Sequence, residues 1–329
     1  MERRVWLFAV ALTVSLIPGT PRAQWRPKVI YGGDDRLDLY QLQNEGVRKL
    51  ADSTVALMRS GKVTVKDGTA QLLTESFSER DNLCPEEPFA GQKTAAFCSG
   101  SLVGPDLVMT AGHCVTSEEA CKDVKFVFGF AVAKEGVAPD SVPAGEVYGC
   151  AKLIGREQVG NGADWAIVQL DRAVSGHAPL KINRSGAIEK GAPLLVIGHP
   201  AGLPLKVAGG ASVRDAGPEG YFVANLDTYG GNSGSAVFNA KTGMIEGILV
   251  RGEQDFEWKG TCRVSKRCED TACRGEDVTR ISVLASRIPA TEPAGAAASL
   301  AAAFSRPDGA FSALVGLAAA ASGSVAAGR

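Results

Sequence analysis

The chain has 329 residues, of which 45% are hydrophobic, and this proportion excludes wholesale disorder and suffices for one large core or two modest ones. Lys and Arg together number 35 against 36 Asp and Glu, so the chain lacks the basic field with which proteins neutralise a nucleic-acid backbone. Nucleic acid is therefore not expected as a partner.

The N-terminus has the pattern of a signal peptide. Two arginines at positions 3 and 4 precede an apolar run over residues 5–17, and the small residue Ala23 closes the segment before Gln24. The apolar run is too short to cross about 30 Å of hydrocarbon as a helix, which disfavours a membrane anchor. We expect residues 1–23 to be removed and the mature protein to be secreted, extracellular or periplasmic, without stable membrane insertion.

Residues 24–93 are expected to lead into the folded region. Within them the segment 39–58 has apolar residues at spacings loosely compatible with a helix.

Short apolar runs punctuated by Gly, Pro, Asn and Asp dominate the middle of the chain. They include residues 126–132, 166–170, 194–197 and 245–250. Each has the length of a strand and several alternate between apolar and polar residues, which favours an all-β barrel or sandwich.

The C-terminal residues 291–329 are rich in Ala, Gly and Ser. Such a composition buries little surface per residue, so we expect a flexible tail and assign it no function.

Eight cysteines follow the expected signal peptide. An even number in an exported protein favours disulfides over free thiols. Zinc is the alternative because Cys262, Cys268 and Cys273 cluster, but their spacings lack the two-residue gap of common zinc sites and no histidine is near. We therefore expect no metal. Five cysteines precede residue 151 and three follow residue 261, so complete pairing requires an odd number of bridges between the two groups.

The most informative segment, residues 97–114, reads Phe-Cys-Ser-Gly-Ser-Leu-Val-Gly-Pro-Asp-Leu-Val-Met-Thr-Ala-Gly-His-Cys. It resembles the strand pair that carries the catalytic histidine in the trypsin and chymotrypsin family. The resemblance implies that His113 is the general base and that Cys98 is bonded to Cys114, a loop closure credited with about 3 kcal/mol. A lone histidine would more often be a buried structural residue, but the length of the motif favours the catalytic interpretation.

A second segment, Asp164-Trp-Ala-Ile-Val-Gln-Leu, is similar to the family's strand with the catalytic aspartate. A buried aspartate accepts a hydrogen bond from the imidazole, fixes its tautomer and stabilises the imidazolium. Asp171 is the competitor, but it stands ahead of Arg172 where a turn aspartate is expected.

A third segment, residues 227–235, reads Asp-Thr-Tyr-Gly-Gly-Asn-Ser-Gly-Ser and resembles the family's nucleophile loop, with Ser233 as the attacking residue. By the same resemblance, the backbone N–H groups of Gly231 and Ser233 form the oxyanion hole. Glycines also suit the backbone angles that such a loop requires. A Gly/Ser turn between strands is the alternative, and the segment alone is only moderately specific, but together with the other two segments, in the order His, Asp, Ser, it is a strong indication.

The order histidine, aspartate, serine separates this chain from α/β-hydrolases, which carry the nucleophile first within Gly-x-Ser-x-Gly. The resemblance implies an all-β fold of two antiparallel six-stranded Greek-key barrels with the active site between them. The first, over residues 94–180, would hold His113 and Asp164, and the second, over residues 181–290, would hold Ser233, with the divide between residues 175 and 190. The implied reaction is acyl transfer from a protein or peptide substrate to Ser233 followed by hydrolysis, by a monomer without a cofactor.

One position departs from the digestive members of the family. Those enzymes have an aspartate before the nucleophile, which pairs with a newly released N-terminal ammonium, whereas this chain has the neutral Asn232. This asparagine and the Val-Phe-Asn that follows Ser235 and Ala236 instead resemble the bacterial glutamyl-endopeptidase branch. Residues 29–36, Val-Ile-Tyr-Gly-Gly-Asp-Asp-Arg, are similar to the mature N-terminal region of that branch.

Substrate preference is expected to depend on Asp227, six residues before Ser233, where trypsin-like members hold the carboxylate that receives Lys or Arg. Thr228 matches a threonine of the glutamyl endopeptidases, but Leu249 stands where their pocket histidine belongs.

Leu249, Val250 and Arg251 are expected to form a wall of the substrate pocket. Arg251 could neutralise Asp227 or itself receive an acidic side chain. The sequence favours basic substrates and leaves open acidic or small apolar ones, as well as a catalytically silent binding module on a protease scaffold.

Overall fold

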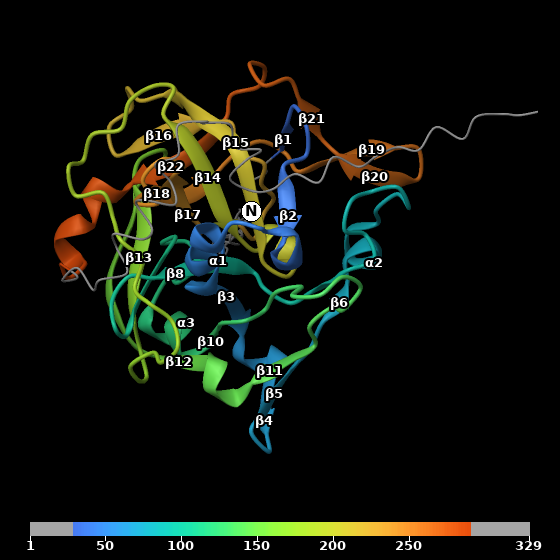
Figure 1. The fold of residues 1–329 in the computed structure, drawn as a ribbon, viewed down its shortest axis with the longest axis vertical. Helices are drawn as coiled ribbons and strands as arrows, with labels where there is room; N and C mark the ends of the chain where they lie inside the picture. Colours follow the sequence, from blue (N-terminus) through green and yellow to red (C-terminus); the bar gives the residue numbers. More distant parts are fainter. Residues whose placement is uncertain (1–28, 291–329) are drawn as a thin grey trace, which may run out of the picture.

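The computed structural model describes residues 29–290. Two closed barrels of antiparallel strands dominate it, the first in blue to green in the lower half of Figure 1 and the second in yellow to orange in the upper half. The expected all-β fold with two six-stranded antiparallel barrels is confirmed.

The first barrel closes in the strand order β10, β12, β13, β9, β8 and β3. In chain order these strands are β3 (Thr54–Arg59), β8 (Cys98–Leu102), β9 (Leu107–Thr110), β10 (Val124–Val127), β12 (Val147–Gln158) and β13 (Asp164–Leu170).

The second barrel closes through pairing of its first two strands, β14 and β15, and β2 (Arg36–Asp38) joins it along β15. Its strands are β14 (Pro193–Gly198), β15 (Lys206–Asp215), β16 (Tyr221–Ala224), β17 (Ala236–Asn239), β18 (Ile245–Arg251) and β22 (Glu276–Arg280).

Smaller elements surround the barrels. The strands are β1 (Ile30–Tyr31), β4 (Val63–Lys66), β5 (Thr69–Leu72), β6 (Glu75–Ser76), β7 (Lys93–Thr94), β11 (Ser141–Pro143), β19 (Phe256–Lys259), β20 (Cys262–Ser265) and β21 (Arg267–Cys268). The α-helices are α1 (Glu45–Asp52), α2 (Phe77–Asp81) and α3 (Glu118–Lys122). Short 3₁₀ turns are η1 (Leu39–Gln41), η2 (Ser60–Lys62), η3 (Ala144–Glu146), η4 (Pro200–Gly202), η5 (Ile281–Val283) and η6 (Ala285–Arg287).

The four apolar runs of the sequence overlap strands β10, β13, β14 and β18. In β18 every residue is buried, and in β13 only Gln169 is partly exposed. Both faces of these two strands are covered, which accounts for their apolar runs at residues 166–168 and 248–250.

The helix suggested for residues 39–58 is only partly present. Helix α1 begins after Asn44, whose side chain caps the N–H of Val47 at 3.1 Å, and it ends at Asp52. From Thr54 the chain is strand β3, which pairs with β8 on one side and β10 on the other. Two-sided pairing in a barrel thus outweighs local helix propensity, and one strand of the first barrel comes from the segment 24–93.

The cores of the two barrels are continuous. The largest hydrophobic cluster includes Val108 and Ile167 from the first barrel together with Leu195 and Ile248 from the second. Loops at the junction are therefore held between two packed bodies rather than on one flexible surface.

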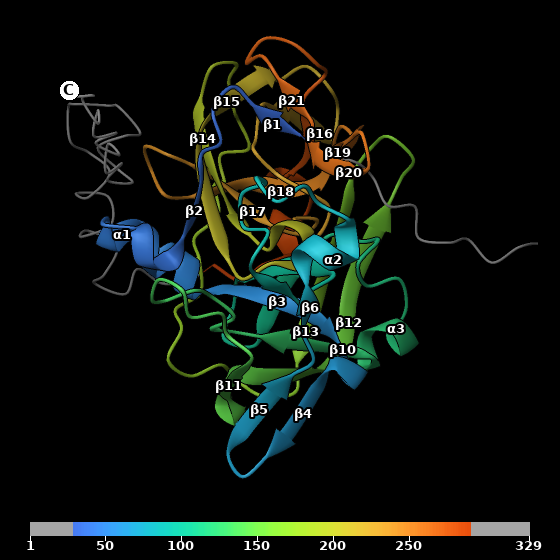
Figure 2. The same ribbon diagram turned by 90° about the vertical axis from the view of Figure 1, so that its right-hand side faces the viewer.

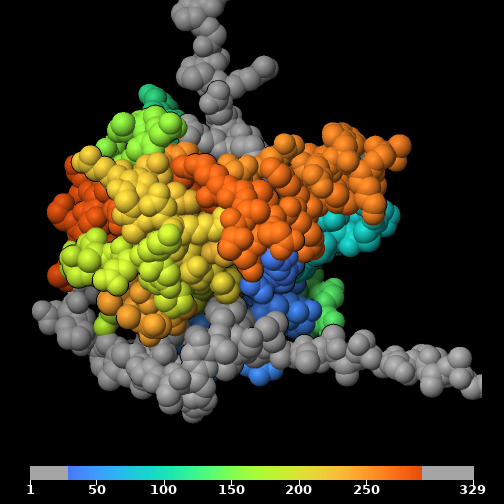
Figure 3. All heavy atoms as spheres, turned by 90° about the horizontal axis from the view of Figure 1, so that it is seen from above, coloured from blue at the N-terminus to red at the C-terminus, as the bar shows by residue number. Residues whose placement is uncertain are grey.

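Two insertions extend from the barrels. The chain between β3 and β8 forms a small sheet with β11, seen at the base of Figure 2, and continues through α2. The β19–β20 hairpin extends from the second barrel toward α2, and Figure 3 shows it in orange beside the cyan segment. A disulfide between Cys84 and Cys262 joins these two insertions.

All eight cysteines are paired, as Cys84–Cys262, Cys98–Cys114, Cys121–Cys150 and Cys268–Cys273. One bridge connects the two cysteine groups, which satisfies the required odd number, and Cys98–Cys114 is the pair that the family resemblance implied.

No helix within residues 29–290 is long and apolar enough to cross a membrane. The expected signal peptide and the Ala/Gly-rich tail lie outside the described residues.

Candidate active site

His113 and Asp164 come from neighbouring strands of the first barrel. His113 follows β9, and Asp164 is the first residue of β13, which pairs with β9. The Nδ1 atom of His113 lies 2.8 Å from Oδ2 of Asp164, and the backbone N–H of His113 donates to Oδ1 at 3.1 Å. Both carboxylate oxygens thus hold the same histidine.

The Asp164 side chain is almost fully buried. Burial alone would raise its pKa, but the hydrogen bonds and charge of His113, with a smaller contribution from Arg251, lower the pKa below the usual range. Asp164 therefore remains a carboxylate beside the imidazole.

The second barrel contributes to the position of Asp164. The hydroxyl of Thr279, in β22, accepts from the backbone N–H of Asp164 at 3.0 Å and donates to its carbonyl at 3.1 Å. Sequence reasoning did not identify Thr279, because nothing in its local pattern indicates a contact 115 residues away.

The alternative aspartate, Asp171, has different partners. It accepts from the backbone N–H of Gly149 at 2.8 Å and pairs with Arg172 at 3.0 Å. Asp171 thus serves the end of β13 and the following turn, whereas Asp164 contacts His113.

The loop of Ser233 is bonded to β8, the strand that pairs with β9, and β9 leads to His113. The carbonyl of Ser233 accepts from the backbone N–H of Ser99 at 2.8 Å and lies 3.6 Å from Sγ of Cys114. Because Cys114 directly follows His113, the structure brings the three motif segments together at the junction of the barrels.

Two glycines are required by the close packing of this loop. Gly231 has φ +93° and Gly234 has φ +91°, values that side chains disfavour. A Cβ atom would lie 2.6 Å from the carbonyl oxygen of His199 at position 231, and 2.0 Å from that of Ser99 at position 234. Substitution at either position would displace the loop.

The backbone N–H groups of the loop fall into two sets. Those of Asn232, Gly234 and Ser235 donate to carbonyls, whereas those of Gly231 and Ser233 have no acceptor within residues 29–290. The latter two are the donors that the family resemblance implies for an oxyanion hole.

Asn232 is held inside the loop by neutral bonds. Its side-chain oxygen accepts from the hydroxyl of Ser235 at 3.2 Å, and its side chain is buried. The carbonyl of Tyr229 accepts from the backbone N–H of Asn232 at 3.0 Å.

Asp227 is bound to the N-terminal segment. Its two oxygens accept the backbone N–H groups of Tyr31 at 2.7 Å and Asp35 at 2.9 Å. Burial raises its pKa to about 7 against these hydrogen bonds. The sequence had marked residues 29–36 as a motif but did not indicate that this segment contacts Asp227.

Arg251 forms an ion pair with Asp277 at 2.9 Å and donates to the carbonyls of Asn161 and Gly162. Among the described residues its hydrogen bonds do not include Asp227, so the charge cancellation considered from the sequence does not occur here.

The other residues expected around the pocket are all buried. Leu249 and Val250 pack into hydrophobic clusters, so their side chains support the site from within the core. The hydroxyl of Thr228 donates to Glu276 at 3.3 Å. Glu276, in β22, is a further buried acidic residue, and no sequence motif indicated it.

Cys98, His113 and Cys114 have potential metal-ligand atoms within 4.8 Å of one another. The two sulfurs are consumed by their disulfide, which leaves the imidazole as the only ligand of this group.

Residues 98–248 match the family model of the trypsin-like peptidase domain, a range that includes His113, Asp164 and Ser233. A comparison with curated proteins found no match.

Proposed function

We propose that this chain, whose trypsin-like peptidase domain supports a place in the trypsin/chymotrypsin-like family, is a secreted serine endopeptidase with His113, Asp164 and Ser233 as its triad. The observation that carries the proposal is the His113–Asp164 pair beside a Ser233 loop with two uncommitted N–H groups.

In the proposed reaction, Ser233 attacks the carbonyl carbon of a peptide bond while Nε2 of His113 takes the hydroxyl proton. Asp164 accepts the Nδ1–H bond, keeps the imidazole in the required tautomer and stabilises the imidazolium. The lowered pKa of Asp164 favours this role, because an ionised carboxylate stabilises the cation.

The tetrahedral intermediate then places its oxyanion at the N–H groups of Gly231 and Ser233. His113 returns the proton to the leaving amine, and water hydrolyses the acyl-enzyme in a second, equivalent cycle. No step requires a cofactor.

The proposed division of the folded region lies between residues 175 and 190. Its support is that the chain passes from β13 in the first barrel to β14 in the second within this stretch. Secretion is proposed from the N-terminal pattern, and four disulfides are consistent with an oxidising compartment.

Cleavage after Lys or Arg is the proposed preference. Its support is that Arg251 is bound to Asp277 rather than to Asp227, and that a further buried acidic residue, Glu276, accepts from the hydroxyl of Thr228, the residue after Asp227. A glutamyl-endopeptidase-like preference has support in Asn232 and Thr228, but two buried carboxylates disfavour an acidic substrate side chain.

The test of the proposed function compares wild type with Ser233→Ala and His113→Ala. We expect a fluorophosphonate probe to label wild type but not Ser233→Ala, and peptide hydrolysis to fall by about 10³-fold or more in both variants. Ser282→Ala, which changes an exposed serine, should retain labelling and activity.

Circular dichroism should show that all variants are folded. Turnover by Ser233→Ala comparable to wild type would contradict the triad. A folded wild type that neither reacts with the probe nor cleaves a peptide library would favour the binding-module alternative.

A further inference from the structure

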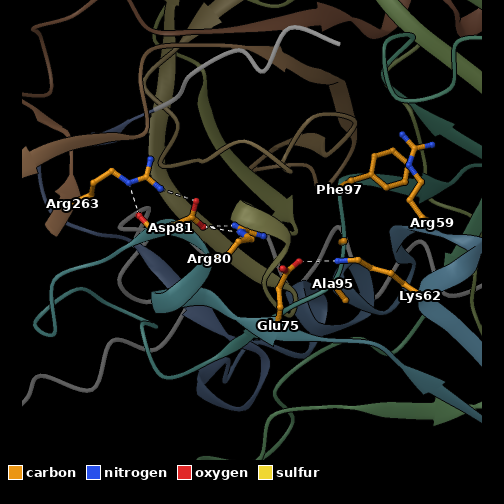
Figure 4. Close-up of a pocket in the computed structure, with 9 residues that line it drawn as sticks. Arg59, Lys62, Glu75, Arg80, Asp81, Ala95, Phe97 and Arg263 are labelled. Carbon is orange, nitrogen blue, oxygen red and sulfur yellow. Dashed lines mark hydrogen bonds and ion pairs between the residues drawn. The ribbon is translucent and has the colours of Figure 1, made fainter. Parts of the chain in front are cut away.

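A cationic pocket of about 420 Å³ is lined in part by residues 95–97, which lead into β8. Figure 4 shows Arg80, Asp81 and Arg263 along one side, with Lys62 and Glu75 between them and Phe97 and Arg59. Its lining residues are Arg59, Lys62, Glu75, Arg80, Asp81, Ala95, Ala96, Phe97 and Arg263.

The cations of this pocket outnumber its carboxylates, with four basic side chains and two acidic ones. Asp81 is shared between Arg80 and Arg263, with an Nη2–Oδ1 distance of 3.0 Å to Arg263, and Glu75 binds Lys62 at 2.8 Å. Two positive charges therefore remain without a matching carboxylate in the lining.

Among these cations, Arg59 has no carboxylate partner in the pocket lining. Its guanidinium lies 4.2 Å from the centroid of the Phe97 ring, and the carboxylate of Asp123, outside the lining, approaches it to only 3.8 Å. Its side chain is half exposed, so it is accessible to an incoming anion.

The pocket is linked to the proposed active site in two ways, through a disulfide and through backbone hydrogen bonds. Phe97 precedes Cys98, which is bonded to Cys114 next to His113. The backbone N–H groups of Ala95 and Ala96 both donate to the carbonyl of Gly202.

Gly202 also lies beside Gly231, one of the two proposed oxyanion donors. Its backbone nitrogen lies 2.8 Å from the place that a Cβ on Gly231 would occupy. The pocket is therefore joined to the Gly231 segment as well as to His113.

We propose that this pocket binds an acidic side chain of the substrate on the leaving-group side of the cleaved bond. The proposal rests on the proposed peptidase function. His113 must give its proton to the leaving amine, so the substrate residues after that bond depart along the His113 side, toward Phe97. An Asp or Glu carboxylate there would meet the excess cations.

The experiment measures kcat/KM on matched peptides that carry Glu or Gln at each of the first four positions after the cleavage site. Wild type should cleave the Glu peptide about two- to fivefold faster at one of these positions, the scale of exposed ion pairs, mainly through KM. The advantage should shrink as salt is raised.

The double variant Arg59→Gln/Lys62→Gln should lose this advantage and cleave the Glu and Gln peptides at the same rate. Lys66→Gln is the matched control, because Lys66 is exposed on β4 outside the pocket lining. Thermal unfolding checks that all three proteins are folded.

The pocket can be tested without catalysis by measuring, with fluorescence anisotropy, how tightly the same peptides bind to Ser233→Ala. Tighter binding of the Glu peptide, lost when Arg59→Gln/Lys62→Gln is added, would support it. Hydrolysis with equal rates for Glu and Gln at every position, and equal binding, would overturn the pocket while leaving the peptidase function in place. Absent hydrolysis with retained Glu-selective binding would overturn the peptidase function and the leaving-group placement, and would leave the pocket as a site for an acidic peptide side chain.

Discussion

A single buried carboxylate, Asp227, links the N-terminal segment to the loop of Ser233. Its oxygens are occupied by backbone N–H groups of Tyr31 and Asp35, and its pKa is raised from 3.8 to about 7 by burial. Because a higher pH favours the ionised form, the attraction of Asp227 for a cationic substrate should strengthen as pH rises through about 7.

We therefore expect the ratio of kcat/KM for a Lys substrate to that for a matched Leu substrate to increase between about pH 5.5 and pH 8.5. Taking the ratio cancels any pH dependence of the catalytic step that both substrates share. In Asp227→Ser the ratio should be low and independent of pH. A constant ratio in wild type, or full Lys preference in the variant, would exclude Asp227 as the selective group.

At the scale of elements, a disulfide joins the insertion around α2 to the β19–β20 hairpin, and neither element is a strand of a barrel. Cys84–Cys262 spans 178 residues, and an adjacent parallel bridge pairs Leu83 with Arg263. By contrast, Cys268–Cys273 spans only 5 residues. A cross-link that closes a long loop removes more entropy from the unfolded chain.

Replacing both Cys84 and Cys262 by Ser should lower the free energy of unfolding by about 3–5 kcal/mol, against about 2 kcal/mol for the Cys268/Cys273 pair. Guanidinium unfolding of the two double variants measures this difference. Equal losses would mean that strain or residual structure, rather than loop length, sets the contribution.

At the scale of the whole molecule, His177 anchors the segment that connects the two barrels through contacts with an aromatic ring and two carboxylates. It lies between β13 and β14, stacks on Phe128 with ring centroids 4.2 Å apart, and contacts Asp52 at 3.0 Å and Glu146 at 2.7 Å. Burial lowers the pKa of His177, but the two carboxylates outweigh it and raise the pKa above 6.5.

A histidine whose pKa is raised on folding stabilises the protein fully below its unfolded pKa, and this stabilisation is lost as pH rises through the folded pKa. The difference in unfolding free energy between wild type and His177→Gln should therefore be largest near pH 6 and decline toward about pH 9. Chemical denaturation across this range measures it. A difference that grows with pH would contradict a charged His177.

The sequence alone determined the features that depend on residues close together in the chain. Residues 97–114 and 227–235 each carry a chemical motif within one short segment, and the apolar runs of β13 and β18 reflect burial of adjacent residues. Residue type and spacing of the apolar runs predict the all-β fold, and the short motifs indicate the candidate triad through their resemblance to a known family, so neither needs knowledge of long-range contacts.

Only the tertiary structure decided the pairings between distant segments. Asp227 meets Tyr31 across 196 residues, and Thr279 meets Asp164 across 115. Similarly, β3 is a strand because β8 and β10 flank it, although its own sequence permitted a helix. Local propensity contributes only a few tenths of a kcal/mol per residue. Strand register and barrel closure determine which distant groups are buried against one another, and no short stretch of sequence encodes those pairings.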